Sequence, residues 1–307
     1  MGEPESAARP ALTIVIPTRD RPVMLNRCLA SVHAAVGSDD EVIVVDSAST
    51  APVSADGARV IRLNQPGVNR ARNAGWREAA HELVAYVDDD VIVDETWADR
   101  FARAAAAHPH HAFYSGRVVA HVTTASSHGN VAVKDDAEPA VLDASSRGDL
   151  GHGANLLVRA NALGAVRGWD ETMGAGAPFQ SSPETDLYDR LFAAGFTGRY
   201  EPSAVARHDQ WRNPTQLVRL DWRYGFGNGA RLAKLVRTDR GRARRVAAEA
   251  AWGWGLQRLG PALRQRNKTD IARVSARLAG TASGFASAVF TPVRNGHFAP
   301  GRSNTSS

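Results

Sequence analysis

The chain has 307 residues, of which 43% are hydrophobic and 22% are charged, as is typical of a globular protein with a substantial core. Its single cysteine excludes an intramolecular disulfide and a cysteine-rich zinc site, and the stretch MGEPESAARPA lacks a signal-peptide apolar region, so we expect a cytoplasmic protein. Residues 1–189 carry a net charge of −10 and residues 190–307 one of +15, an asymmetry that indicates a polyanionic partner for the basic part.

Apolar, β-branched runs alternate with helical patterns in the first third of the chain. Strands are predicted at residues 12–18, within 40–50, at 58–63 and at 83–87, and helices at 22–36 and 69–82. This alternation predicts a mostly parallel sheet with helices on both faces. Ligands in such sheets bind beyond the carboxyl ends of the strands, where Thr18, Asp46 and the triplet Asp88–Asp90 all lie.

The remaining sequence is less regular. It predicts a strand at 112–122, a polar loop at 123–149, a strand running into a helix at 153–166, a Gly- and Pro-rich loop at 168–183, a helix at 183–195 and a strand or hairpin at 196–208. From residue 214 to about 290 the pattern is helical, with arginine-rich faces. A long loop in a compact domain is usually functional or disordered.

The acidic triplet follows a buried strand. In an extended segment Asp88 and Asp90 point the same way and Asp89 points the opposite way. Two carboxylates on one side hold a hard cation such as Mg²⁺ or Mn²⁺ and leave coordination sites for phosphate oxygens. By itself such a triplet is more often a solvated acidic turn, but its place among polar strand ends favours the metal site.

Several blocks then occur in a specific order: TIVIPTRDRPVMLNRCLASV, EVIVVDSAST, GVNRARNAGWREAAHELVAYVDDDV, GANLLVRANAL with GWDE, and ETDLYDRLFAAGF. Together, over about residues 11–210, they resemble the family 2 glycosyltransferases of the GT-A fold. The resemblance implies an α/β, Rossmann-like catalytic domain over residues 1–212. Nucleotide-sugar binding is expected at about 11–122 and the acceptor and base part at about 150–212. A basic helical extension with a flexible tail is expected over 213–307.

The resemblance also implies an activity: inverting transfer of a sugar from a nucleoside-diphosphate sugar to an acceptor hydroxyl, with Mn²⁺ or Mg²⁺ as cofactor. A UDP-sugar is the favoured donor, and the acceptor is a carbohydrate, a lipid-linked molecule or a small molecule. The expected nucleotide-sugar residues are Pro17, Thr18, Arg19, Asp46, Arg72, Asp88 and Asp89. The expected metal ligands are Asp88, Asp90 and His208, and the acceptor-side residues are Asn155, Trp169 and Asp170. Trp169 fits stacking on a sugar and packing in the core equally well.

The chain departs from the family pattern at two places. Ser47 stands where many members have a second acid after the position of Asp46. Pro183 and Glu184 stand where many have Glu-Asp, which places Glu184 at the position of the catalytic base, with Asp186 as the alternative. A carboxylate in a partly closed site accepts a hydroxyl proton, but acids are also favoured in the first turn of a helix for structural reasons alone.

Two other classes compete with a glycosyltransferase. A nucleotidyltransferase of related architecture requires a Gly-rich, basic loop after the first strand, and PTRDRPVML has no glycine. A non-catalytic glycosyltransferase-like binding subunit is opposed by retention of the acidic residues and His208.

The basic C-terminal third also has two readings. Its arginines, followed by Trp252, Trp254, Leu256 and Leu259, fit a peripheral contact with the inner face of the membrane. They fit equally a helical subdomain that packs on the core. No nucleic-acid partner is expected, because these helices lack a reading motif.

Overall fold

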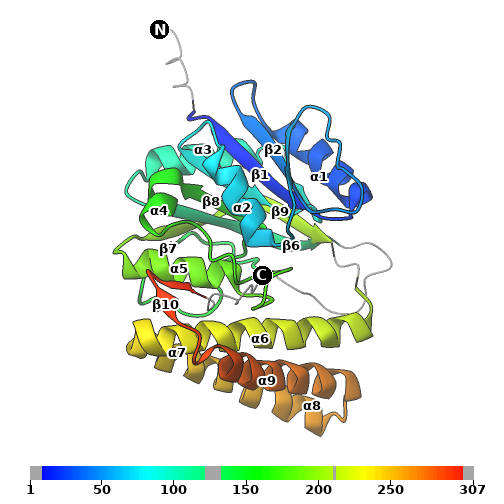
Figure 1. The fold of residues 1–307 in the computed structure, drawn as a ribbon, viewed down its shortest axis with the longest axis vertical. Helices are drawn as coiled ribbons and strands as arrows, with labels where there is room; N and C mark the ends of the chain where they lie inside the picture. The colour runs from blue at the N-terminus through cyan, green and yellow to red at the C-terminus, as the bar shows by residue number, and fades with distance from the viewer. Residues whose placement is uncertain (1–8, 122–132, 210–211, 300–307) are drawn as a thin grey trace, which may run out of the picture.

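The structure, a computed structural model, describes residues 9–121, 133–209 and 212–299. Its centre is a nine-stranded sheet in the order β3-β2-β1-β4-β8-β6-β9-β5, with β7 paired to β9 (Figure 1). The strands are β1 (Leu12–Thr18), β2 (Glu41–Ser47), β3 (Arg59–Leu63), β4 (Leu83–Val87), β5 (Val91–Val93), β6 (Phe113–His121), β7 (Ala140–Leu142), β8 (Asn155–Arg159) and β9 (Gly198–Asp209).

The half of the sheet built from β3, β2, β1 and β4 is parallel, as the alternation of strands and helices predicts. Its register sets Thr18 directly beside Asp46. The other half is mixed: β8 runs antiparallel to β4, and β5 runs antiparallel to β9. The β5–β9 register places Val91 opposite His208, so the acidic triplet that precedes β5 lies beside this histidine.

Helices cover both faces of the sheet. Helices α1 (Pro22–Ala35) and α3 (Trp97–Ala107) pack on one face. The other face is covered by α2 (Val68–Arg77), α4 (Ala160–Ala165) and α5 (Pro183–Ala193). The apolar stripe of α1 explains its placement, because its side chains at three- and four-residue spacing are all buried. The expected GT-A-type arrangement of sheet and flanking helices is therefore confirmed.

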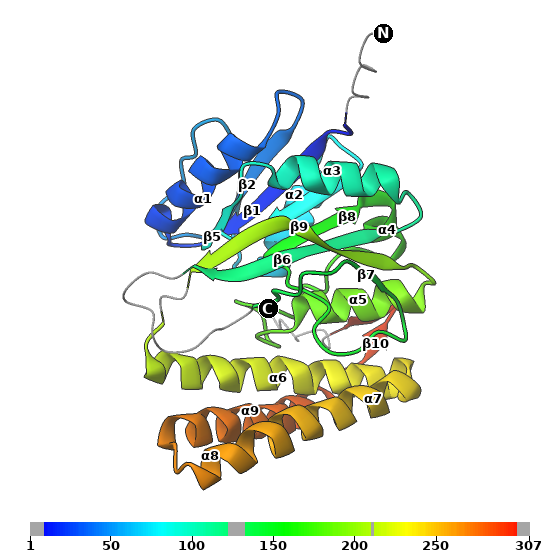
Figure 2. The same ribbon diagram turned by 180° about the vertical axis from the view of Figure 1, so that it is seen from behind.

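The basic C-terminal part forms a second helical layer beside the sheet, and both ribbon views show α6 between the sheet and the other helices of the layer (Figures 1 and 2). This layer consists of α6 (Pro214–Thr238), α7 (Arg240–Ala250), the π-helix η1 (Ala251–Leu259), α8 (Gly260–Arg264) and α9 (Lys268–Ala288). Glycines let α6 and α9 pack closely, since a Cβ on Gly225 would lie 2.0 Å from the Arg277 carbonyl oxygen. In the described residues no helix is long and apolar enough to cross a bilayer.

After α9 the chain returns to the part of the molecule that contains the large sheet. The hairpin of β10 (Val293–Arg294) and β11 (His297–Phe298) packs Phe298 against Met173 and Phe179, which lie in the long loop before α5. The predicted polar loop at 123–149 contains β7, and its residues 122–132 lie outside the described part of the chain. The flexible tail predicted at the C-terminus falls in part on this hairpin and in part on residues 300–307, which also lie outside the described part.

Candidate active site

The carboxyl ends of β1 and β4 meet at one edge of the sheet and hold the acidic triplet in place. Thr18 Oγ1 donates a hydrogen bond of 2.7 Å to Asp89 Oδ2. Arg21, in the loop after β1, places its Nη1 atom 3.0 Å from Asp89 Oδ1 and 3.0 Å from Asp90 Oδ2. The first loop thus supplies the positive charge that three adjacent carboxylates require. Arg21 was absent from the predicted site, although its position in PTRDRP, beside an acidic strand end, was a usable signal.

The chain turns at Asp89 and Asp90, so the alternation expected of an extended segment is wrong: these two neighbours share Arg21, whereas Asp88 and Asp90 have different partners. Asp88 Oδ1 accepts a 2.8 Å hydrogen bond from Arg72 Nη2, whereas Asp90 Oδ1 lies 3.5 Å from His208 Nε2. Burial raises the pKa of Asp89 to about 7, despite the charge of Arg21. Burial also acts to raise the pKa of Asp90, but His208 and Arg21 hold that pKa well below its usual range.

These residues fit a divalent cation that arrives together with a diphosphate. Asp90 offers an oxygen atom and His208 a nitrogen atom as metal ligands. Asp88, two residues before Asp90, is partly exposed. Within the described residues, no group of three or more His, Cys, Asp or Glu is arranged to hold a metal unaided. Mg²⁺ in phosphate-transfer sites is bound by one or two carboxylates together with substrate phosphates, and Mn²⁺ accepts similar ligands. The donor set suits such a shared site.

Asp46 is fully buried, and its carboxylate braces the loop after β2. Its oxygens accept hydrogen bonds of 2.8 Å from Arg62 Nη1 and 2.8 Å from the Ser49 backbone N–H. Of the other predicted nucleotide residues, Pro17 pairs within the sheet with Val45. Arg19 is exposed at the surface. The contacts of Asp46, Pro17 and Arg19 with a nucleotide remain predictions.

Arg72 is a buried cation with spare hydrogen-bond donors. Among the described residues its Nε and Nη1 atoms have no hydrogen-bond partner. The guanidinium group lies 4.6 Å from the centroid of the Trp169 ring, and Trp169 packs edge-on against Tyr86. Gly153 permits this placement, because a Cβ there would lie 2.9 Å from Arg72 Nη2. Unpartnered guanidinium donors at a strand end suit a phosphate group.

Glu184 lies in the first turn of α5 and is partly exposed. Helix α5 begins after Ser182, which adopts a left-handed conformation with φ of 61°. Burial raises the pKa of Glu184, although the nearby charges of His152 and Arg72 act to lower it. A carboxylate with a raised pKa is a better proton acceptor near neutral pH. His152, whose Nε2 lies 3.2 Å from Asp149 Oδ2, was not predicted from the sequence.

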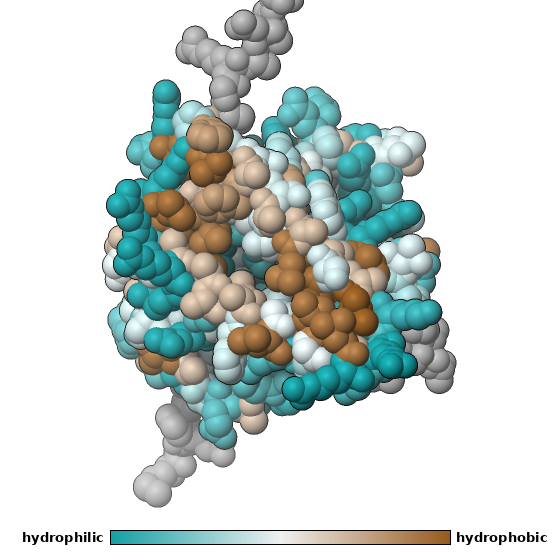
Figure 3. Space-filling view, turned by 90° about the horizontal axis from the view of Figure 1, so that it is seen from below, coloured by the Kyte–Doolittle hydropathy of each residue, from teal (hydrophilic) through white to brown (hydrophobic). Residues whose placement is uncertain are grey.

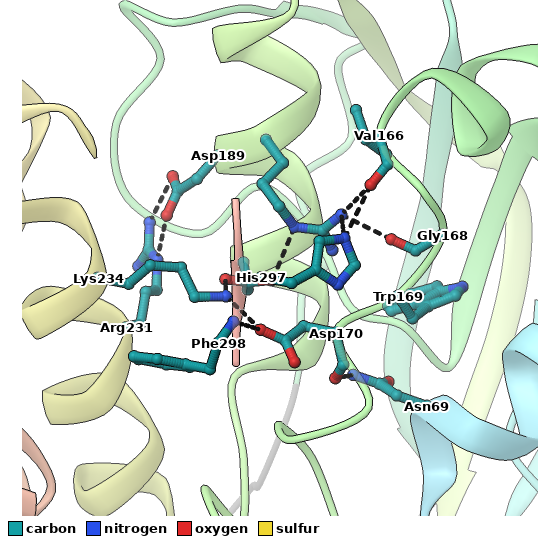
Figure 4. Close-up of polar contacts among 12 residues, drawn as sticks. Asn69, Val166, Gly168, Trp169, Asp170, Asp189, Arg231, Lys234, His297 and Phe298 are labelled. Carbon is teal, nitrogen blue, oxygen red and sulfur yellow. Dashed lines mark hydrogen bonds and ion pairs between the residues drawn. The ribbon is translucent and has the colours of Figure 1, made fainter. Parts of the chain in front are cut away.

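Asp186 has a different environment from Glu184, two residues earlier on the same helix. It is buried, and its Oδ2 accepts a 3.0 Å hydrogen bond from Arg190 Nε. Its Oδ1 lies 2.6 Å from Lys234 Nζ of α6. The same ammonium group lies 2.5 Å from Asp170 Oδ2, which also accepts a hydrogen bond from the Phe298 backbone N–H, as Figure 4 shows. Asp170 and Asp186 therefore join the catalytic part to the helical layer and the hairpin.

The other two predicted acceptor-side residues are buried in supporting contacts. Asn155 Oδ1 accepts a 2.7 Å hydrogen bond from Trp97 Nε1, and its amide nitrogen donates to two backbone carbonyls. Trp169 is almost completely buried, between Arg72 and Tyr86. Of the two readings of Trp169, core packing is the one that its burial supports.

Helix α6 contacts the segment that leads into α5, which the sequence did not indicate. Ser181 Oγ donates to the Tyr224 carbonyl oxygen at 3.2 Å, and Ser182 Oγ donates to Asn228 Oδ1 at 2.7 Å. Burial raises the pKa of Tyr224 to about 12, and the charges of both Glu184 and Asp90 contribute to this rise. These contacts join α6 to the start of the helix that carries Glu184.

Comparisons with known proteins agree with this architecture. Residues 13–143 match the family described as glycosyl transferase family 2. The pre-mycofactocin glycosyltransferase of Mycobacterium tuberculosis, in strains CDC 1551 / Oshkosh and ATCC 25618 / H37Rv, is 30% identical over 294 residues, which cover 89% of this chain and 58% of that protein. The chain thus spans little more than half the length of these curated relatives.

Two solved structures are similar in fold over nearly the whole chain. The mannosyltransferase PcManGT from Pyrobaculum calidifontis, in complex with GDP-Man and Mn²⁺, has a TM-score of 0.58 at 15% identity and covers 92% of this chain and 89% of its own. Residues 1–349 of S. aureus TarS, in complex with UDP, have a TM-score of 0.57 at 14% identity, covering 91% of this chain and 90% of that one. The chain has the GT-A fold, and its residues 13–143 belong to glycosyl transferase family 2.

Proposed function

We propose that the chain is an inverting glycosyltransferase that moves a hexose from a nucleoside-diphosphate sugar to an acceptor hydroxyl, with the help of a divalent cation. The observation that carries the proposal is the meeting of two different sets of groups at one edge of the sheet. One set suits a diphosphate: Arg72 with spare donors, and the Asp90–His208 pair. The other is Glu184, a carboxylate with a raised pKa that suits a proton acceptor.

The donor half of the site would stabilise the leaving group. A nucleoside diphosphate gains negative charge as the glycosidic bond breaks, and preorganised donors aimed at that charge lower the barrier. Arg72 is held against Trp169 and paired with Asp88, so its guanidinium group is already oriented at the end of β4. When bound, a divalent cation supplies Lewis-acid stabilisation of the same charge. Asp46 contributes by fixing the loop after β2 through Arg62 and Ser49.

The acceptor half would activate the hydroxyl. Glu184 accepts its proton as the oxygen attacks the anomeric carbon from the side opposite the diphosphate, and a single displacement of this kind inverts the configuration. Asp186 suits this role less well, because Arg190 and Lys234 already neutralise its carboxylate. Tyr224 and Asn228 of α6 contact the residues directly before α5, which supports a part for the helical layer in acceptor selection.

The donor is expected to be a UDP- or GDP-hexose. GDP-Man is present in the PcManGT structure and UDP in the TarS structure, which makes both nucleotides reasonable probes. The sequence resemblance still favours UDP as the nucleotide of the donor. The name of the Mycobacterium tuberculosis relative adds pre-mycofactocin to the acceptors to be tried.

The test is release of nucleoside diphosphate from a panel of UDP-, GDP- and dTDP-sugars, with Mn²⁺, with Mg²⁺ and with a chelator. Metal-dependent release from one donor class, together with a thermal shift by that donor, supports the proposal. NMR of the glycoside product then shows whether its anomeric configuration is inverted. Thermal stabilisation by donors without any release identifies a binding subunit instead. In a separate assay, release of pyrophosphate from a nucleoside triphosphate and a sugar 1-phosphate identifies a nucleotidyltransferase.

A further inference from the structure

The outer face of the helical layer carries large apolar side chains that the chain itself does not cover. Trp252 is 59% exposed, Leu256 66% and Leu263 54%. Figure 3, which views the molecule from the side of this layer, shows hydrophobic residues gathered on the face and bordered by hydrophilic ones. Trp252 and Leu256 belong to η1, and Leu263 belongs to α8, which follows it directly.

Packing within the described part of the chain does not account for the apolar character of Trp252 and Leu256. The π-helix η1 contains no buried residue. A Cβ added at Gly253 or Gly255 would meet no atom within 4 Å. Helices in proteins take most of their stability from packing of an apolar face. Trp254, by contrast, is stacked within the chain, with Arg277 4.5 Å from its ring centroid.

The segment that carries this face is rich in positive charge. Residues 239–268 contain 8 Lys/Arg and 2 Asp/Glu. Its exposed basic side chains include Arg240, Arg244, Arg258, Arg264, Arg266 and Lys268, whereas Arg245 contacts the Ala144 carbonyl oxygen. Exposed tryptophan and leucine in a basic helical segment match the boundary between headgroups and acyl chains of an anionic bilayer.

We propose that this face, formed by η1, α8 and the basic residues around them, attaches the protein to the surface of an anionic lipid bilayer. A second copy of the chain is a poorer occupant, because a symmetric contact would bring two basic rims together. Attachment is peripheral, since no described helix is able to span a bilayer. Helix α6 separates the face from the sheet (Figure 2), so attachment leaves the carboxyl edge of the sheet uncovered and is independent of the proposed reaction.

The test is co-sedimentation of the full chain with vesicles of phosphatidylcholine alone and of phosphatidylcholine with phosphatidylglycerol. Binding is expected only to the anionic vesicles, and it should be lost at high salt because exposed charges are screened. The double variant Trp252→Ser/Leu256→Ser and the double variant Arg244→Gln/Arg264→Gln should each weaken binding at least about tenfold. All four positions are exposed, so thermal melts should be unchanged.

A matched control removes exposed apolar side chains from the catalytic part. Val23→Ser/Val141→Ser changes residues that are 74% and 54% exposed and should leave vesicle binding unchanged. Equal binding to both vesicle types, or binding that none of the helical-layer variants weakens, overturns the proposal. A dimer in sedimentation velocity that Trp252→Ser/Leu256→Ser dissociates also overturns it, since the face would then join two copies. Diphosphate release is measured in parallel, so failure of attachment is distinguishable from failure of the proposed activity.

Discussion

The ammonium group of Lys234 lies 2.5 Å from the carboxylate of Asp170, and both groups are buried. Lys234 belongs to the helical layer, whereas Asp170 belongs to the loop that holds Trp169 under Arg72. Because the same ammonium group also contacts Asp186, one cation neutralises two carboxylates of the catalytic part. The helical layer therefore helps to hold the residues of the active site in position.

Replacing Lys234 with Met should destabilise the whole chain. The change leaves Asp170 and Asp186 buried without their cation, and breaking a buried pair in this way costs about 3–5 kcal/mol. The free energy of unfolding in urea measures the loss. Arg244→Met, at an exposed position of α7, is the control and should change it by less than about 0.5 kcal/mol. Similar small effects of both changes would show that the pair contributes little.

The same pair makes stability depend on pH. Burial acts to raise the pKa of Asp170, but Lys234 outweighs it and lowers the pKa to about 2, below the usual value of 3.8. A carboxylate with a depressed folded-state pKa contributes stability that is fully present above the unfolded-state pKa and is lost as the pH falls through the folded-state pKa. The contribution, about 2 kcal/mol, should therefore disappear between about pH 4 and pH 2.

Asp170→Asn isolates this effect from the titration of other carboxylates. The difference in unfolding free energy between wild type and variant should be largest above pH 4 and should shrink toward pH 2. A difference that stays constant over this range would assign the cost of the substitution to packing rather than to charge.

Much of the parallel half of the sheet could be predicted from sequence, and the reason is physical. Buried strands such as 12–18 and 83–87 are continuous β-branched runs, and their ends carry the polar residues Thr18 and Asp88 that mark the ligand edge. The helical C-terminal region was likewise predictable from its periodicity. Short elements such as β5 and the β10–β11 hairpin were not, because two or three residues carry no periodicity.

The partners of individual side chains were the least predictable feature of the site. Asp170 and Asp186 have the residue type of site carboxylates, and only the fold reveals that Lys234, far along the sequence, neutralises both. The contact of Tyr224 with Ser181 was missed for the same reason, since nothing in a helical pattern indicates which turn meets the loop before α5. Local pattern specifies the elements, whereas contacts between distant elements depend on packing.

Two glycines of the helical layer should respond differently to alanine. In Gly225→Ala the new Cβ would lie 2.0 Å from the Arg277 carbonyl oxygen, so α6 and α9 must separate. We expect a loss of at least about 2 kcal/mol in the free energy of unfolding, as for other overpacked positions. In Gly253→Ala the Cβ meets nothing within 4 Å, so the change should be neutral or stabilising by up to about 1 kcal/mol. Destabilisation by Gly253→Ala would mean that the new Cβ does meet a neighbouring group.

Glu184→Gln should separate binding from turnover. The amide keeps the shape of the side chain but accepts no proton, so turnover should fall at least about a hundredfold while donor binding persists. Asp186→Asn should behave differently and lower stability, because its carboxylate is paired with Arg190 and Lys234. The donor-induced thermal shift and the rate of diphosphate release measure the two effects. An active Glu184→Gln enzyme would exclude Glu184 as the base.

The pH dependence of turnover tests the same assignment by a different route. Burial raises the pKa of Glu184. As the pH is lowered, kcat/KM should therefore begin to fall at a pH above 4.5, the usual pKa of a glutamate. The charge of His152 acts to lower this pKa, so His152→Gln removes that effect and should move the acidic limb to higher pH. His33→Gln, in helix α1 and paired with the Asp56 carbonyl oxygen, is the control and should leave the limb in place. A limb that His152→Gln leaves unmoved, or moves to lower pH, would mean that the group titrating in the profile is not Glu184. The sign of the shift therefore distinguishes this base from any carboxylate that His152 does not face.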